Sequence, residues 1–181
     1  DVLKAMNVSY YYNSSAFCFT NKALAIYLKT LGKSFTKHIP IEMLHLPKQY
    51  LELLFEALII GDGSRRIRDT VSQNENINYY TTSERLANQV QELILKLGYN
   101  SNITVTVPKN PRWNPKFSIS RRTSQESHIQ PKHIMEVEYD GFIYCVNIEP
   151  EHRIVVRRNG KPIICGNCWW MTIVPTNGKE K

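Results

Sequence analysis

The densest apolar stretch of the chain lies at residues 51–64 and predicts a helix. Apolar side chains recur there at helical spacing, at Leu51, Leu54, Phe55 and Leu58. The stretch is too short to cross a membrane, and it ends at Gly61-Asp62-Gly63. We therefore expect Asp62 at the C-terminal end of the helix, where the helix dipole disfavours a carboxylate and a cation would neutralise it.

Two small residues, Ala57 and Gly61, lie four positions apart and therefore on one face of this predicted helix. Small side chains at this spacing allow a second helix to approach closely, so we predict a helix–helix interface on this face. An ordinary core helix that ends in a Gly-Asp-Gly turn would give much the same pattern. The stretch alone leaves both interpretations open.

Upstream of this stretch, the N-terminal region predicts a hairpin followed by a capped helix. Aromatic residues flank an Asn-Ser-Ser turn at 13–15, and Thr20 or Asn21 can cap a helix that runs to Leu31. Pro47 is expected in the first turn of the central helix.

Downstream, a second helix is predicted between strands. The strands are expected at 64–68, 77–81, 103–107 and 116–122. Ser83 is a good N-cap for a helix from about Glu84 to Leu97, with its apolar residues on one face. The order of a strand, a capped helix and a Leu-Gly end is the same here as in the N-terminal region. This similarity indicates either a repeated unit or chance.

The pattern changes after a polar linker at 123–133, and we place a domain boundary near residue 130. Two hairpins are predicted beyond it, each with a turn that contains glycine. The first pairs Met135–Tyr139 with Phe142–Val146, and the second pairs Arg153–Arg157 with Lys161–Cys165.

Charge favours a polyanionic partner such as DNA. In the 181 residues, Lys and Arg outnumber Asp and Glu by 23 to 16, which gives a net charge of +7. No apolar run reaches the length of a membrane span and no signal peptide is visible, so we expect no membrane partner and a cytoplasmic location, or that of a host protein. The first residue is Asp1 rather than Met, which predicts a piece of a longer chain.

The cysteines are too few and too scattered for a disulfide scaffold. They lie at Cys18, Cys145, Cys165 and Cys168. The last two have CxxC spacing, but without a second pair or a nearby His this is a weak signal for zinc or redox chemistry.

Residues 55–63 resemble the LAGLIDADG motif of homing endonucleases. Ala57 and Gly61 match its small interface residues, Asp62 matches its metal-binding catalytic carboxylate, and Ile60 replaces its first Asp. The resemblance implies an αββαββα fold that cleaves double-stranded DNA with Mg²⁺ and lays basic strands in the DNA groove. The arginines that this assigns to DNA contact are Arg65, Arg66, Arg68, Arg121 and Arg122.

Residues 134–168 resemble the C-terminal part of an intein, the self-splicing Hint domain. The resemblance places the splice junction at Asn167-Cys168, with His152 and Cys145 in the preceding block. It implies that Asn167 cyclises to a succinimide, that Cys168 accepts an acyl group, that His152 transfers protons and that Cys145 assists. Gly166 replaces the usual penultimate His, which predicts slower cyclisation or help from another group. A pair of ordinary hairpins with a chance Asn-Cys is the alternative.

These patterns together predict an α+β protein: a LAGLIDADG αββαββα-type endonuclease half plus the all-β C-terminal part of a Hint domain. The expected units are the tail of a first endonuclease repeat at 1–32, a second repeat at 33–130, a splicing segment at 131–167 and the start of the C-terminal host sequence at 168–181. The expected partners are double-stranded DNA and the N-terminal remainder of the same intein, with Mg²⁺ for the endonuclease and no cofactor for splicing. The alternatives are a LAGLIDADG module that binds DNA without cutting it, and a free-standing homing endonuclease or maturase.

Overall fold

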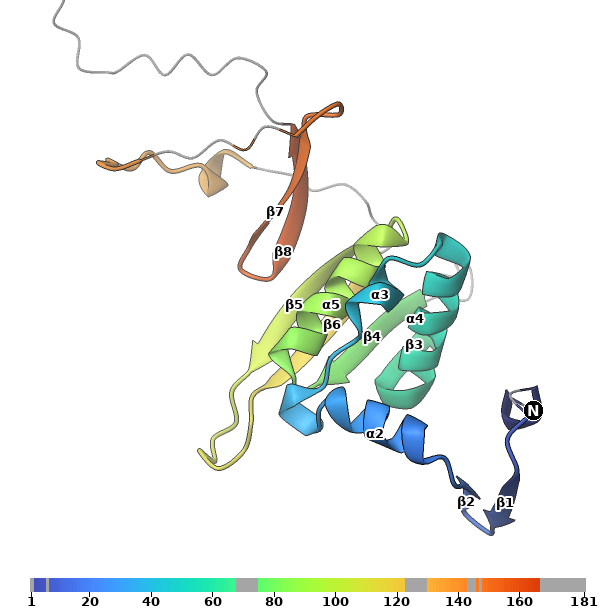
Figure 1. Ribbon diagram of the computed structural model, residues 1–181. Coiled ribbons are helices and arrows are strands. Elements are labelled where there is room, and N and C mark those ends of the chain that lie inside the picture. The colour runs from blue at the N-terminus through green and yellow to red at the C-terminus, as the bar shows by residue number, and fades with distance from the viewer. Residues whose placement is uncertain are drawn as a thin grey trace, which may run out of the picture.

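The computed structural model describes residues 2–5, 7–67, 75–122, 130–142, 146 and 148–166. Its centre is a four-stranded antiparallel sheet in the order β3-β4-β6-β5, and helices α4 and α5 cover one face of it (Figure 1). The elements of this layer are α4 Lys48–Asp62, β3 Gly63–Ile67, β4 Glu75–Thr81, α5 Glu84–Lys96, β5 Asn100–Thr106 and β6 Lys116–Arg122.

The chain order of these elements is αββαββ, which agrees with the first six elements of the predicted fold. Asp62 is the last residue of α4 and Ser83 is the N-cap of α5, as predicted. Pro47, expected in the first turn of α4, is its N-cap, one residue before that turn. Beyond β6, the described residues contain the short 3₁₀ turn η2 (Pro131–His133) and a hairpin, but no α-helix. The last helix of the αββαββα order is therefore not seen in the described part of the chain.

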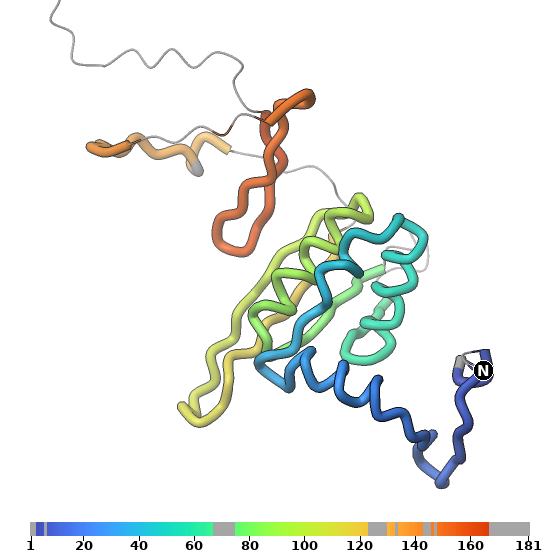
Figure 2. Tube along the Cα trace, in the orientation of Figure 1, coloured from blue at the N-terminus to red at the C-terminus, as the bar shows by residue number. Residues whose placement is uncertain are grey.

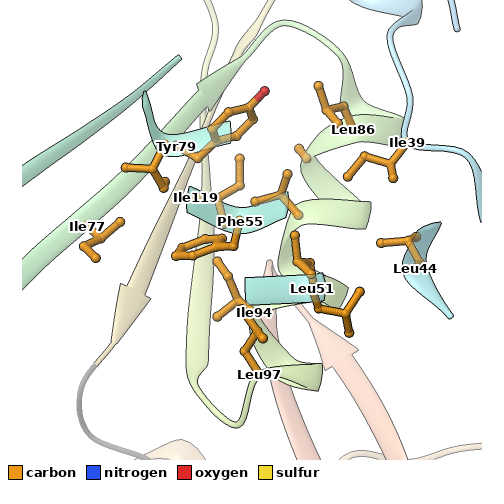
Figure 3. Close-up of a cluster of buried hydrophobic side chains, with 14 of the residues drawn as sticks. Ile39, Leu44, Leu51, Phe55, Ile77, Tyr79, Leu86, Ile94, Leu97 and Ile119 are labelled. Atoms are coloured by element: carbon orange, nitrogen blue, oxygen red, sulfur yellow. The ribbon is translucent and has the colours of Figure 1, made fainter. Parts of the chain in front are cut away.

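The hydrophobic core lies between the two helices and the sheet (Figure 3). Helix α4 contributes every fourth residue, and α5 contributes the apolar face that its sequence predicts. The core side chains of these helices and of β4 and β6 include Leu51, Phe55, Ile59, Leu86, Val90, Leu93, Ile94, Ile77, Tyr79 and Ile119, all of which are buried. Burial of this apolar surface is what fixes α4 against the sheet and so positions its C-terminal end.

The strand register separates the two faces of the sheet. Ile77 pairs with Arg121 and Tyr79 with Ile119, so these residues share the face that the helices cover. The intervening pair Asn78–Ser120 points to the other face. We call this second face, which neither α4 nor α5 covers, the open face.

The N-terminal region confirms the predicted hairpin and capped helix. Its elements are α1 Val2–Ala5, β1 Tyr10–Asn13, β2 Ala16–Phe19, α2 Lys22–Thr30, η1 Ser34–Thr36 and α3 Ile41–Leu44. Helix α2 has Asn21 as its N-cap and buries no residue, and the β1–β2 hairpin extends away from the central sheet (Figure 2). The parallel with α5 extends to the backbone, because both helices are followed by a left-handed glycine, Gly32 at φ +82° and Gly98 at φ +91°.

Of the two hairpins predicted near the C-terminus, the second is confirmed and the first is wrong where the structure describes it. The second consists of β7 (Arg153–Arg158) and β8 (Lys161–Gly166), which pair antiparallel. Residues 134–142 contain no strand, and apolar side chains there such as Met135 and Phe142 are 79% and 82% exposed. A two-stranded hairpin needs a surface on which to pack, and these side chains have none among the described residues.

None of the described helices is long and apolar enough to span a bilayer.

Candidate functional site

Asp62 lies where the sequence predicts it, at the C-terminal end of α4. Its side chain is 60% exposed, and its Oδ2 lies 3.9 Å from Nζ of Lys37, with which it forms an ion pair. Asp62 is held there by the next residue, Gly63, whose backbone N–H bonds to the carbonyl oxygen of Ile59 and which continues directly into β3. An exposed carboxylate on a rigid helix end can bind a cation or a water molecule from solvent.

Tyr79 lies in β4 near this carboxylate, opposite Gly63 in the strand register. Burial of the phenol raises its pKa from 10.0 to about 12, and the negative charge of Asp62 adds to the shift. Tyr79 therefore stays protonated and uncharged at neutral pH. The negative charge at this edge of the core comes from Asp62 and not from the phenol.

The predicted interface residues Ala57 and Gly61 lie on an exposed face of α4. A Cβ atom built at Gly61 would meet no atom within 4 Å. Leu53 and Ile60 extend the same face and are 66% and 83% exposed. The face is thus apolar and without a packing partner among the described residues, which is the surface that close helix pairing requires.

Two of the five predicted DNA-contacting arginines belong to the helix-covered side of the sheet. Arg65 pairs with Glu56 of α4 at 2.6 Å and with Glu75 at 4.0 Å. Arg121 lies 3.5 Å from Glu75, and its guanidinium stacks 4.5 Å from the centre of the Tyr99 ring. Both side chains are therefore engaged in contacts within the domain.

Two other arginines, Arg66 and Arg122, lie on the open face. Arg66 pairs with Asn76, and Arg122 pairs with Asn100, in registers that alternate with the core-facing pairs. Both side chains are exposed, so their charges are available to a polyanion. The fifth predicted arginine, Arg68, lies outside the described residues.

Polar residues fill the rest of the open face. Ser120 Oγ donates to Asn78 Oδ1 at 2.6 Å, and Asn78 Nδ2 donates to Asn76 Oδ1 at 3.1 Å. Lys116 lies over the Tyr80 ring at 4.3 Å. Sequence reasoning did not select these residues, although the period-two alternation of β4 and β6 contains the signal. Amides, hydroxyls and cations on an exposed sheet are the groups that contact base edges and phosphates.

The β7–β8 hairpin brings the chain just after His152 opposite the chain near the end of the predicted splicing segment. Arg153 pairs with Gly166 at the open end of the hairpin, and His152 directly precedes this pair. The backbone N–H of His152 donates to the carbonyl oxygen of Ile148 at 3.0 Å, which fixes the chain as it enters β7. The other predicted splicing residues, Cys145, Asn167 and Cys168, lie outside the described residues.

The CxxC pair receives no support from the described side chains. Cys165 is a partly buried free thiol in β8, and Cys168 lies outside the described residues. No group of three His, Cys, Asp or Glu side chains is placed to hold a metal ion in the part of the chain that the structure describes.

This combination of a two-layer α+β domain, a helix that ends in an exposed carboxylate and a polar open sheet has a counterpart among known families. The family described as "LAGLIDADG-like domain" matches residues 49–131, which run from the second residue of α4 through β6 to the first residue of η2. Residues 49–131 thus form a LAGLIDADG-like domain.

Two curated relatives are DNA polymerases of Thermococcus. The protein from Thermococcus sp. (strain GE8) is 24% identical over 156 residues, covering 65% of this chain, and that from Thermococcus hydrothermalis is 22% identical over 160 residues, covering 67%. In both cases the match spans only 9% of the polymerase.

Proposed function

We propose that this chain is the C-terminal portion of an intein that carries half of a LAGLIDADG homing endonuclease. In this proposal the LAGLIDADG-like domain binds double-stranded DNA through its open face, and Asp62 is a catalytic carboxylate. The main support is the position of Asp62, at the end of a helix whose small-residue face is exposed. A second helix that packs on Ala57 and Gly61 would bring its own terminal residues beside Asp62.

Asp62 fits Mg²⁺ as one ligand of a shared site. Mg²⁺ prefers carboxylate oxygens, keeps several waters, and in phosphoryl-transfer sites is held by one or two carboxylates plus phosphate oxygens. When bound it activates a water for attack and stabilises charge on the phosphate. No three metal-ligating side chains cluster among the described residues, and the proposal assigns the partner carboxylate to the second helix that packs on Ala57 and Gly61.

The isolated chain is therefore expected to leave supercoiled plasmid uncut in Mg²⁺ buffer. Co-expression with the upstream half of the same intein is expected to produce cleavage, and Asp62→Asn in this chain is expected to abolish it while DNA binding remains. Robust cutting by the isolated chain would contradict the shared site. An assembled pair that never cuts, and that binds DNA equally well with and without the Asp62→Asn substitution, would favour the alternative of a DNA-binding module.

For the splicing segment, the proposal assigns junction cleavage to Asn167. The Asn167 side-chain amide nitrogen attacks its own main-chain carbonyl carbon, a succinimide forms, and the 167–168 peptide bond breaks. The attacking nitrogen loses one proton and the leaving amine of Cys168 gains one, and His152 accepts the first and supplies the second. The pairing of Arg153 with Gly166 carries this proposal, because His152 and Asn167 are the residues next to that pair along the chain.

The other roles in splicing follow the same assignment. Cys168 accepts the acyl group of the upstream thioester through its thiolate, and Cys145 moves protons in the earlier acyl shift. A match confined to 9% of each DNA polymerase is what we expect of an insert carried by a larger host protein.

Mass spectrometry of the purified chain tests the junction. Slow release of the Cys168–Lys181 peptide is expected, with complete loss in Asn167→Ala and a lower rate in His152→Ala. Absence of the peptide across a range of pH and thiol concentrations would count against Asn167 as the cyclising residue and favour a free-standing endonuclease or maturase.

A further inference from the structure

The turn of the β7–β8 hairpin is bonded to the LAGLIDADG-like domain at the edge of the sheet. The carbonyl oxygen of Gly160 accepts a hydrogen bond from the backbone N–H of Ile103 at 3.0 Å and another from Gln91 Nε2 at 2.9 Å. Ile103 belongs to β5, which is the edge strand next to β6. The turn thus satisfies an N–H that an edge strand otherwise leaves to solvent. In Figures 1 and 2 the hairpin stands beside β5 and α5 at this edge.

Only glycine fits at the contact point. Gly160 has φ +71°, and a Cβ atom there would lie 2.4 Å from the carbonyl oxygen of Ile103. Asn159 precedes it with φ +51°, so the pair forms the left-handed two-residue turn that Asn-Gly favours. The Asn-Gly sequence therefore meets two separate demands, the turn itself and close approach to β5.

Gln91 joins the two parts from the helix side. It is 2% exposed, and its amide nitrogen bonds to Gly160 and, at 3.4 Å, to the carbonyl oxygen of Ser101. Its Oε1 accepts from Arg157 Nη1 of β7 at 3.3 Å, and the same Nη1 donates to Asn88 Oδ1. A buried amide whose bonds reach another segment is costly to leave unpaired, so this contact specifies the position of the hairpin.

Apart from Pro162, which is buried next to the turn, the hairpin has little packing of its own. A groove of about 790 Å³ separates α5 from the hairpin, with Leu95 on one side and Pro162 on the other. Val155 and Ile164 are 59% and 65% exposed. Because a lone two-stranded hairpin is marginal in water, its order depends on the contacts at its turn.

We propose that Gln91 and Gly160 anchor the C-terminal hairpin to the LAGLIDADG-like domain. Contact with this domain then keeps the hairpin structurally ordered from its turn to its open end. Gln91 is then a positioning residue for the open-end pair Arg153–Gly166, although it lies in another domain. Its effect on the Asn167-Cys168 junction rests on the proposed function, whereas the anchor itself does not.

Amide hydrogen exchange on the full chain tests the anchor directly. The measurement uses Asn167→Ala as the background, so that the junction stays intact. Gly160→Asn keeps a residue type that tolerates positive φ but adds the clashing Cβ, and Gln91→Ala removes the amide donor. We expect the amides of β7, β8 and Ile103 to exchange at least about tenfold faster in both variants.

Arg85→Ala is the matched control, since Arg85 is exposed on α5 beside the groove and is expected to leave exchange unchanged. The Gly160→Asn substitution lies in the hairpin and not in the core of the domain. Faster hairpin exchange in this variant therefore reports loss of the anchor rather than damage to the core. Unchanged hairpin exchange in both Gly160→Asn and Gln91→Ala would overturn the proposal.

Junction cleavage is then compared in the chain that retains Asn167. We expect both anchor variants to release the Cys168–Lys181 peptide several-fold more slowly than Arg85→Ala. Faster hairpin exchange with an unchanged release rate would refute the positional coupling to the junction. If even the wild-type chain releases no peptide, the Asn167 assignment fails, and hydrogen exchange still decides whether the anchor exists.

Discussion

The hydroxyl of Ser83 donates a 2.6 Å hydrogen bond to the carbonyl oxygen of Lys37. The same Oγ accepts from the backbone N–H of Leu86 at 3.2 Å, so one buried side chain both caps α5 and holds the segment before α3. That segment carries Lys37, whose ammonium group lies 3.9 Å from Asp62. A helix cap thus determines which cation neighbours the candidate catalytic carboxylate.

Ser83→Ala is expected to lower the free energy of unfolding by about 2 kcal/mol, because it removes a cap and leaves the Lys37 carbonyl without its donor. Urea denaturation measures the change. Asn21→Ala is the matched control, since Asn21 caps α2 by accepting from Leu24 N at 2.9 Å, but α2 buries no residue. An equal loss in the two variants would contradict the double role of Ser83.

The glycines at the end of α4 are expected to respond in opposite directions to alanine. Gly61→Ala is expected to leave the isolated chain as stable or about 0.5 kcal/mol more stable, because its Cβ enters open space in a helix. Gly63→Ala is expected to cost about 2 kcal/mol, because its Cβ would lie 2.6 Å from backbone atoms of Ile59. Urea denaturation of the three proteins side by side makes the comparison.

The same Gly61→Ala variant is expected to weaken association with the upstream half, where a second helix needs a small residue at this position. Analytical ultracentrifugation of the mixed halves measures it. Association that tolerates the extra methyl group would show that the exposed face of Ala57 and Gly61 is not the interface.

Alkaline pH is expected to destabilise the fold partly through Tyr79. Its pKa of about 12 in the folded chain exceeds the ordinary value of 10.0, so the folded state holds the phenol proton more tightly than the unfolded state. This stabilisation is complete below pH 10 and is lost as the pH rises through 12, with a total on the order of 2 kcal/mol.

Tyr79→Phe is therefore expected to show a shallower fall in unfolding free energy than wild type between pH 10 and 12. Tyr50→Phe serves as the control, because Tyr50 is 48% exposed on α4. Parallel pH profiles for wild type and Tyr79→Phe would show that folding does not raise the pKa of this phenol.

Local sequence signals were sufficient for the helices of the domain and for their ends. Pro47, Ser83 and the Leu-Gly ends act through one turn of backbone, so their effect can be predicted without knowing the tertiary structure. The position of Asp62 at the end of α4 also follows from the pattern, because the apolar run stops there. Its exposure does not follow, since Asp62 comes seven residues after Phe55 and therefore lies on the buried side of the helix, where only the end of α4 leaves it open to solvent.

Features that depend on non-local pairing could not be predicted. The segment at 135–139 has as good a strand pattern as β7, yet of the two hairpins predicted near the C-terminus the described residues form only the one whose turn contacts Gln91 and Ile103. The arginines illustrate the same limit. Arg65 and Arg66 are adjacent, and only the pairing with β4 determines that one faces Glu56 and the other the open face.

This division of the arginines leads to a prediction for DNA binding. Arg66 and Arg122 are exposed on the open face, so each is expected to neutralise a phosphate and release counterions. Replacing either by Gln is expected to weaken binding to any duplex and to reduce the slope of log K against log salt by about 1. Fluorescence anisotropy with one labelled duplex over a KCl series measures both quantities.

Arg85→Gln removes the same charge from α5, on the helix-covered side of the sheet, and is expected to leave the salt slope unchanged. Net charge is then equal among the three variants, so a difference between them reports position rather than total charge. Equal weakening by all three would mean that DNA senses only the overall positive charge of the chain. That result would contradict the proposal that the open face is the DNA-binding surface.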